Sequence, residues 1–175
     1  EAISLSEMVL ATNPENSEAL GILAIAHAFS GLSGWQGTTQ ENAEKAIEIA
    51  RRALTLDPVN LNALIARAYG ECILGQFERS VETGRQCLAH NPNDWTGHVV
   101  LSHVLTYAGA YEEAVQYAES AIALSRGGVH MGSLFHAQCL AYYGAKRYQD
   151  AVTWCEKLIQ QYPKFPIVQI YVVAL

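Results

Sequence analysis

The sequence predicts an all-α fold, an α-solenoid of stacked antiparallel helix hairpins, and three observations support this prediction. First, helix-stopping dipeptides recur, and Asp57-Pro58 and Asn91-Pro92 are 34 residues apart. Second, Tyr162-Pro163 follows a further 71 residues later, close to two more periods, and Asn13-Pro14 gives an earlier stop. Third, small residues recur at fixed distances before these stops. Such a period is typical of helix pairs that bury their apolar faces only by stacking.

Small or apolar side chains stand twelve, eight and five residues before each stop, if Arg126 is taken as the stop whose proline is missing. Spacings of four and three place them on one helix face, where they let another helix approach closely. They are Ala46, Ala50 and Ala53; Ser80, Gly84 and Cys87; Ala114, Ala118 and Ala121; and Ala151, Cys155 and Leu158. The first helix of each hairpin carries a small residue of its own, namely Ala24, Ala68, Ser102 and Cys139.

An aromatic residue stands fifteen residues before three of the stops, at Phe77, Tyr111 and Tyr148. Together these positions resemble the tetratricopeptide repeat, with a large–Leu–small–aromatic first helix, then Ala, an aromatic or small residue, Ala and a closing Pro. The resemblance covers nearly the whole chain and implies a right-handed superhelix. Three residues depart from the pattern: Arg67 and Gln138 replace the usual Leu, and His98 replaces a bulky apolar residue.

We therefore expect one repeat array over residues 1–175. Its predicted elements are the second helix of a truncated repeat at 1–12, hairpins at 16–57, 60–91, 94–125 and 129–162, and a truncated next or capping helix at 165–175. Asp94 or Asn93 is expected to cap the helix that opens at Trp95. Because the chain begins and ends inside helical patterns, we expect it to be a piece of a longer protein.

Two places break the period. The first hairpin holds a ten-residue insertion within Gly31–Gln40, after which Thr38 and Glu41 predict a capping box that restarts the helix. Trp35 lies in this insertion, which is either a surface loop folded back on the hairpin or a binding loop. At Ser125-Arg126-Gly127-Gly128 the proline is missing, and two glycines predict a change in hairpin angle.

Composition narrows the classes of function. The net charge is −6 and no run of Lys or Arg occurs, which argues against a nucleic-acid partner. The longest apolar stretches, such as 167–175, are too short to span a bilayer, so we expect no membrane insertion. The four cysteines form no CxxC pair and fall at small or apolar sites of the repeat. We therefore expect buried thiols rather than disulfides, and a cytoplasmic protein.

No catalytic, metal or phosphate-binding motif is present. His98 and His103 are five residues apart and His130 and His136 six, so neither pair shares the i,i+4 face of a helical metal site. The run of Glu41, Glu44 and Glu48 is expected to be a solvated face paired with Lys45 and Arg52, four residues further on. We expect no enzyme activity, no metal and no cofactor.

In tetratricopeptide arrays the first helices line a concave groove, and the resemblance implies which residues do so here. They are Ile22, Ile25, Phe29, Asn62, Ile65, Tyr69, Ile73, Val99, His103, Tyr107, His136, Leu140 and Tyr143. This set is apolar and aromatic. It contains almost no cation, so it does not resemble the basic clamp with which one branch of the family holds a chaperone's terminal carboxylate. We expect no such clamp here, because an unpaired anion is disfavoured in an apolar groove.

We therefore expect a non-catalytic protein–protein interaction scaffold whose groove binds a peptide or an amphipathic helix, with Tyr69, Tyr107 and Tyr143 as anchors. The groove is alternatively covered by another part of the parent protein. A second hypothesis is a sensory or regulatory region of a larger signalling protein. The Trp35 loop and the Ser125–Gly128 junction loosely resemble repeat regions attached to bacterial class III nucleotide cyclases or winged-helix regulators.

A third hypothesis is a homodimer. Ile167, Ile170 and Val173 form an apolar face at the end of the array, and such faces pair two copies when they remain exposed.

Overall fold

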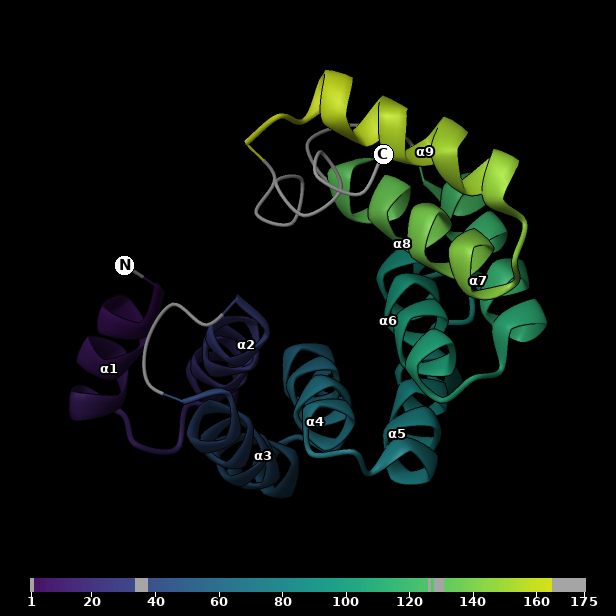
Figure 1. Ribbon diagram of the computed structural model, residues 1–175. Coiled ribbons are helices and arrows are strands. Elements are labelled where there is room, and N and C mark those ends of the chain that lie inside the picture. The colour runs from purple at the N-terminus through teal and green to yellow at the C-terminus, as the bar shows by residue number, and fades with distance from the viewer. Residues whose placement is uncertain (1, 34–37, 126, 128–130, 165–175) are drawn as a thin grey trace. The chain divides into compact units, whose positions relative to one another are not determined.

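The computed structural model describes residues 2–33, 38–125, 127 and 131–164, and every regular element within these ranges is a helix (Figure 1). The chain divides into two compact units, Glu1–Asn91 and Pro92–Leu175, and each is described by itself. The boundary coincides with the Asn91-Pro92 helix stop. The predicted all-α fold of helix hairpins is confirmed. The expectation of a single array over 1–175 stays a prediction.

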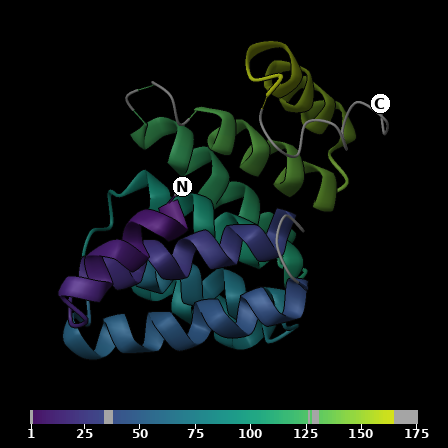
Figure 2. The ribbon, with the colours of Figure 1, turned by 90° about the vertical axis from the view of Figure 1, so that its left-hand side faces the viewer.

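The first unit contains α1 (Ala2–Thr12), α2 (Ser17–Ser33), α3 (Thr39–Leu56), α4 (Leu61–Ile73) and α5 (Phe77–Ala89). In this unit α2 packs against α1, α3 and α4, and α4 packs against α3 and α5 (Figure 2). The second unit contains α6 (Trp95–Tyr107), α7 (Tyr111–Leu124), α8 (Met131–Gly144) and α9 (Tyr148–Gln161). Here α8 packs against α6, α7 and α9, and α6 packs against α7.

Side chains cap the helices where the sequence places them. The backbone N–H of Glu41 donates to Thr38 Oγ1 at 3.1 Å, and the Thr38 N–H donates to Glu41 Oε2 at 3.2 Å, so the predicted capping box is confirmed. Asp94 is the N-cap of α6 and accepts from the Thr96 N–H at 2.8 Å. These bonds satisfy backbone donors that the first helical turn leaves without intrahelical partners.

The core is made largely of the small residues that the period singles out. All twelve of the residues that precede the stops are buried, and the alanines of α3 at Ala46, Ala50 and Ala53 are fully buried. Gly70 of α4 is equally constrained, because a Cβ there would lie 2.7 Å from Ile47 Cγ1 of α3. The predicted close-approach face is therefore confirmed.

The turns inside three hairpins share one backbone conformation. Gly75 and Gly109 have φ of +72° and +83°, and Lys146 occupies the equivalent place with φ of 61°. In this left-handed region glycine carries no steric penalty, whereas a residue with a Cβ does. The turn geometry thus persists at Lys146 although its glycine is missing.

His98 and Gln138, two residues that depart from the repeat pattern, have different surroundings in the structure. His98 Nε2 hydrogen-bonds the Pro92 carbonyl at 2.8 Å, and its ring lies 5.6 Å from that of Tyr117. Gln138 is buried, and its Oε1 has no hydrogen-bond partner within the described residues. On the acidic face of α3, Arg51 forms the close ion pair with Glu48 at 2.8 Å and lowers the pKa of that carboxylate, and the expected partner Arg52 also lowers this pKa through its charge.

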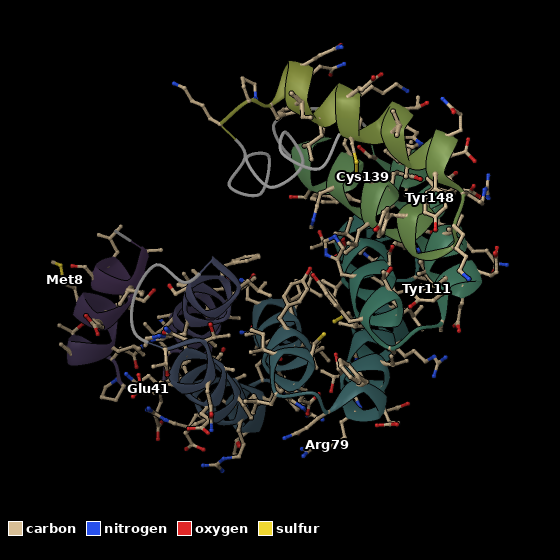
Figure 3. All side chains as sticks on the ribbon, in the orientation of Figure 1. Met8, Glu41, Arg79, Tyr111, Cys139 and Tyr148 are labelled. Atoms are coloured by element: carbon tan, nitrogen blue, oxygen red, sulfur yellow. A yellow bond between two sulfur atoms is a disulfide. The ribbon has the colours of Figure 1, made fainter. Side chains whose placement is uncertain are left out.

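The expectation of four unpaired thiols is wrong for half of them. Cys139 of α8 and Cys155 of α9 form a disulfide, with their Cα atoms 5.3 Å apart, and Cys139 is labelled in Figure 3. Small residues bring the two helices within the distance that a disulfide spans. Cys72 and Cys87 stay as buried thiols, and burial raises the pKa of Cys72 to about 11. The expectation of a cytoplasmic protein was based on four unpaired thiols, and the disulfide contradicts that basis.

Several expectations fall outside the described residues. These are Trp35, the helix at 165–175, the dimer face of Ile167, Ile170 and Val173, and Arg126 and Gly128 of the junction. No helix in the described part of the chain has the length and apolarity needed to cross a bilayer.

The cysteine assignment can be tested by alkylation. We expect iodoacetamide to modify two of the four cysteines of the denatured, unreduced protein, and all four after reduction. Mass spectrometry of proteolytic fragments identifies the modified sites, which should be Cys72 and Cys87 before reduction. Modification of all four without reductant would contradict the disulfide.

Asn60 joins two hairpins of the first unit. Its Oδ1 accepts from the Ala63 N–H at 3.0 Å, and its Nδ2 donates to the Ser17 carbonyl of α2 at 3.0 Å. We expect Asn60→Ala to lower the free energy of unfolding by about 2 kcal/mol, because a helix cap and a buried interhelical bond are both lost.

Urea denaturation followed by circular dichroism measures this change. Asn62→Ala is the matched control, since the Asn62 amide bonds Glu18 in an exposed position, and it should change stability by about 0.5 kcal/mol or less. Equal effects of the two substitutions would contradict the role of Asn60.

Candidate partner-binding surface

In the first unit, two adjacent helices contribute the residues that the resemblance places in the groove. Ile22, Ile25 and Phe29 are three to seven positions apart on α2 and share one face. The predicted residues of α4 also share a face, and they are Asn62, Ile65, Tyr69 and Ile73. The rings of Phe29 and Tyr69 meet, with centroids 5.9 Å apart. The two faces are therefore neighbours.

The predicted groove residues of α2 and α4 differ in their exposure to solvent. Ile22 and Phe29 are exposed, and Phe29 leaves 47% of its surface open. Ile25, Asn62 and Ile73 are half-buried, whereas Ile65 and Tyr69 belong to the core. Tyr69 is only 6% exposed, so it supports Phe29 from below rather than presenting itself to a partner. The Asn62 amide donates to Glu18 Oε1 at 3.1 Å.

In the second unit the corresponding helices are α6 and α8. Val99, His103 and Tyr107 lie four residues apart on α6, and His136, Leu140 and Tyr143 lie three or four apart on α8. The two imidazole rings meet across the helix pair, with centroids 4.8 Å apart. Val99 and both histidines are buried, and Leu140 is half-buried.

The exposed part of this surface is aromatic. Tyr107 follows His103 by one helical turn and is 49% exposed, and Tyr143 follows His136 by two turns and is 66% exposed. Tyr148 of α9 packs edge-on against Tyr143 at 5.7 Å, and Tyr111 of α7 contacts the backbone region of Gly144. Figure 3 labels Tyr111 and Tyr148 on their helices.

The sequence pattern identifies Tyr111 and Tyr148 as repeat positions, but it does not indicate that they belong to this surface. The signal for both was their recurrence fifteen residues before each stop, at the point where the second helix begins. Their side chains line the same end of the hairpins as the last residues of α6 and α8. A hollow of about 410 Å³ lies between the two turns of this unit and is lined by Tyr111 and Lys146, among others.

The histidine pair is held in its neutral form. Burial lowers the pKa of His136 to about 4 and that of His103 well below its ordinary value of 6.5. The neighbouring His136 lowers the pKa of His103 further, because two positive charges would face each other. Within the described residues, no group of three or more His, Cys, Asp and Glu is arranged to hold a metal ion.

These pKa directions predict a stability change with pH. Well above pH 6.5 the two histidines are neutral in both the folded and the unfolded chain, so they do not reduce the free energy of unfolding. Below pH 6.5 the unfolded chain takes up protons that the folded chain does not, and stability falls as the pH approaches 4. For His136 alone we expect a loss of about 2 kcal/mol at pH 5 relative to pH 7.5.

Urea denaturation at the two pH values tests this expectation. His136→Asn should reduce the pH-dependent part of the stability, whatever its effect at pH 7.5. His90→Asn is the control, because His90 is exposed, and it should leave the pH dependence as it is in the unsubstituted protein. The same pH dependence in the His136 variant would contradict the neutral buried pair.

Comparison with solved structures places this arrangement among known folds. TTC0263, a thermophilic TPR protein of Thermus thermophilus, is 20% identical, with a TM-score of 0.78 over 98% of this chain and 87% of that one. MamA is 20% identical, with a TM-score of 0.61 over 93% of this chain and 87% of its own. PilF of Pseudomonas aeruginosa is 15% identical, with a TM-score of 0.59 over 97% of this chain and 72% of its own.

No family model matches the sequence, and no curated protein does. At identities of 20% and below, likeness between structures speaks for the fold. The described helices, their buried small faces and these neighbours agree with the pattern read from the sequence. The chain has the fold of the tetratricopeptide repeat proteins.

Proposed function

We propose that this protein is a non-catalytic interaction scaffold that binds a peptide or an amphipathic helix of a partner protein. The observation that carries the proposal is the pair Tyr107 and Tyr143, which stand about half exposed or more on adjacent helices. A large aromatic side chain combines an apolar body with a hydroxyl group, which suits a surface that is wet until a partner covers it.

The chemistry of the neighbouring residues indicates the kind of partner. The thirteen residues of the predicted groove include no Lys, Arg, Asp or Glu. The histidines beneath Tyr107 and Tyr143 are neutral at pH 7, because burial lowers their pKa values. An apolar side chain of a partner therefore meets no unpaired charge on this surface, whereas a carboxylate meets no cation among these residues.

The first unit offers a second apolar surface of the same kind. Ile22 and Phe29 lie on one face of α2, where both are exposed and are two helical turns apart. Helices that bind in apolar grooves present side chains at i, i+3 or i+4 and i+7, and the spacing of Ile22 and Phe29 matches such a partner. An alternative in which the protein regulates a larger signalling protein stays a prediction, since no described contact favours it.

Peptide selection followed by mutation tests the proposal. Peptides are selected on the full chain from a display library of amphipathic helices, and their affinity is measured by fluorescence anisotropy. We expect Tyr107→Ala and Tyr143→Ala each to weaken binding about ten-fold or more, because each removes an aromatic anchor. Their circular dichroism spectra should match that of the unsubstituted chain, since both side chains are exposed.

Phe77→Ala is the matched control: this aromatic residue is 37% exposed, but it begins α5, a second helix of the first unit, whereas Tyr107 and Tyr143 belong to the second unit. Its affinity for the selected peptides should be unchanged. A library that yields no binder, or binders that are indifferent to both Tyr107 and Tyr143, would count against an apolar groove in this part of the chain.

A further inference from the structure

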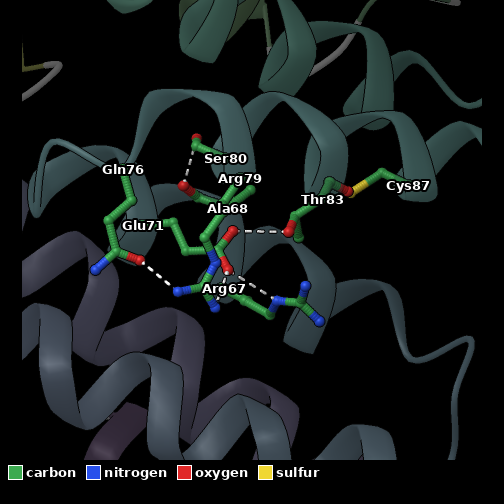
Figure 4. A network of polar contacts seen from close by, with 8 residues as sticks. All are labelled: Arg67, Ala68, Glu71, Gln76, Arg79, Ser80, Thr83 and Cys87. Carbon is green, nitrogen blue, oxygen red and sulfur yellow. Dashed lines mark hydrogen bonds and ion pairs between the residues drawn. The ribbon is translucent and has the colours of Figure 1, made fainter.

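A buried carboxylate organises the interface between α4 and α5. Glu71 is fully buried, and its carboxylate accepts from the Thr83 hydroxyl at 2.7 Å and from Arg67 Nε at 3.1 Å (Figure 4). Nη2 of Arg79 lies 3.4 Å from the same carboxylate, and Arg79 also donates to Gln76 Oε1 at 2.9 Å. One buried anion therefore positions two guanidinium groups.

The charges of this network do not balance. Glu71 supplies one negative charge against two positive charges from Arg67 and Arg79. Arg67 uses only Nε, and its two terminal amino groups have no partner within the described residues. Its side chain is 31% exposed, so these groups face a partly desolvated space. A guanidinium with unused donors in such a place favours an oxygen anion.

The unused donors face a hollow. Arg67 and Arg79 line a space of about 400 Å³ together with Arg51 of α3. Arg51 binds Glu48 through Nε and Nη2, which leaves its Nη1 available. The remaining wall is formed by Ile47, Leu54 and Thr55. Three of the chain's 11 Lys and Arg residues thus meet at one apolar-walled hollow, although the net charge of the chain is −6.

This hollow is separate from the predicted groove. Arg67 is two positions from both Ile65 and Tyr69 on α4, which corresponds to about 200° around the helix axis. The groove residues and Arg67 therefore occupy opposite faces of α4. The volume falls within the range of small-molecule sites, which combine an apolar wall with a few placed polar groups.

We propose that the hollow is an oxyanion site that takes the carboxylate or phosphate group of a small molecule. The anion lies between Arg51 and Arg67, and Arg79 is held beside them by Glu71. The apolar part of the ligand packs against Ile47 and Leu54. Because Glu71 holds Arg67 and Arg79, and Glu48 holds Arg51, before binding, little side-chain order has to be created when the ligand arrives. This site does not depend on the proposed partner-binding function.

Titration of the full chain tests the site with two probes, hexanoate and inorganic phosphate. Each is added at pH 7 to ¹⁵N-labelled protein, with sodium chloride adjusted to keep the ionic strength constant. We expect saturable shifts of the Arg67 Nε–H signal with one or both probes. Tighter binding of hexanoate identifies an apolar carboxylate as the ligand class, and tighter binding of phosphate identifies a phosphate compound.

Arg51→Gln is the test variant, because Arg51 is exposed and makes no contact with Glu71, so the buried network stays intact. We expect its affinity for the tighter probe to fall about ten-fold, the value of one charge-assisted contact. Arg52→Gln is the matched control on the same helix, and its affinity should be unchanged. No saturable shift, unchanged affinity in Arg51→Gln, or an equal loss in both variants would overturn the site.

Discussion

Close approach between neighbouring helices is the constraint on which the rest of this structure depends. The alanines of α3 are fully buried, and a Cβ added at Gly70 would lie 2.7 Å from Ile47, so the α3–α4 interface has no room for a larger side chain. Each small residue buries little apolar area. The stability of the fold therefore comes from many contacts rather than from a few large side chains. The short helix spacing also carries Cys139 and Cys155 to within disulfide reach.

The same packing determines what happens to polar groups within the interfaces. Glu71 is placed where no water reaches, so its charge has to be met by protein donors. Thr83 and two arginines do so, and the arginines are drawn to one place as a result. His103 and His136 have the opposite outcome: burial keeps them neutral, which suits an apolar surface above them.

Two faces of the first helices of the hairpins thus carry different chemistry. On α2, α6 and α8 the predicted groove residues that stay exposed are aromatic or aliphatic, as at Phe29, Tyr107 and Tyr143. On the opposite face of α4, Arg67 turns toward α3 and α5 and meets arginines from both. A repeat of one pattern therefore presents an apolar surface on one face and a cationic hollow on another, because neighbouring positions of a helix point in different directions.

The helix ends, the hairpin order and the buried small face follow from the sequence, because caps, stops and spacings of three and four residues act within one or two turns. The tertiary structure decided the exposure of each predicted groove residue: Phe29, Tyr107 and Tyr143 stay open, whereas Tyr69 and His103 are enclosed. It also decided that Cys139 pairs with Cys155, and that three arginines line one hollow. Exposure and pairing depend on side chains contributed by other helices, and their distances are properties of the packed chain rather than of any local pattern.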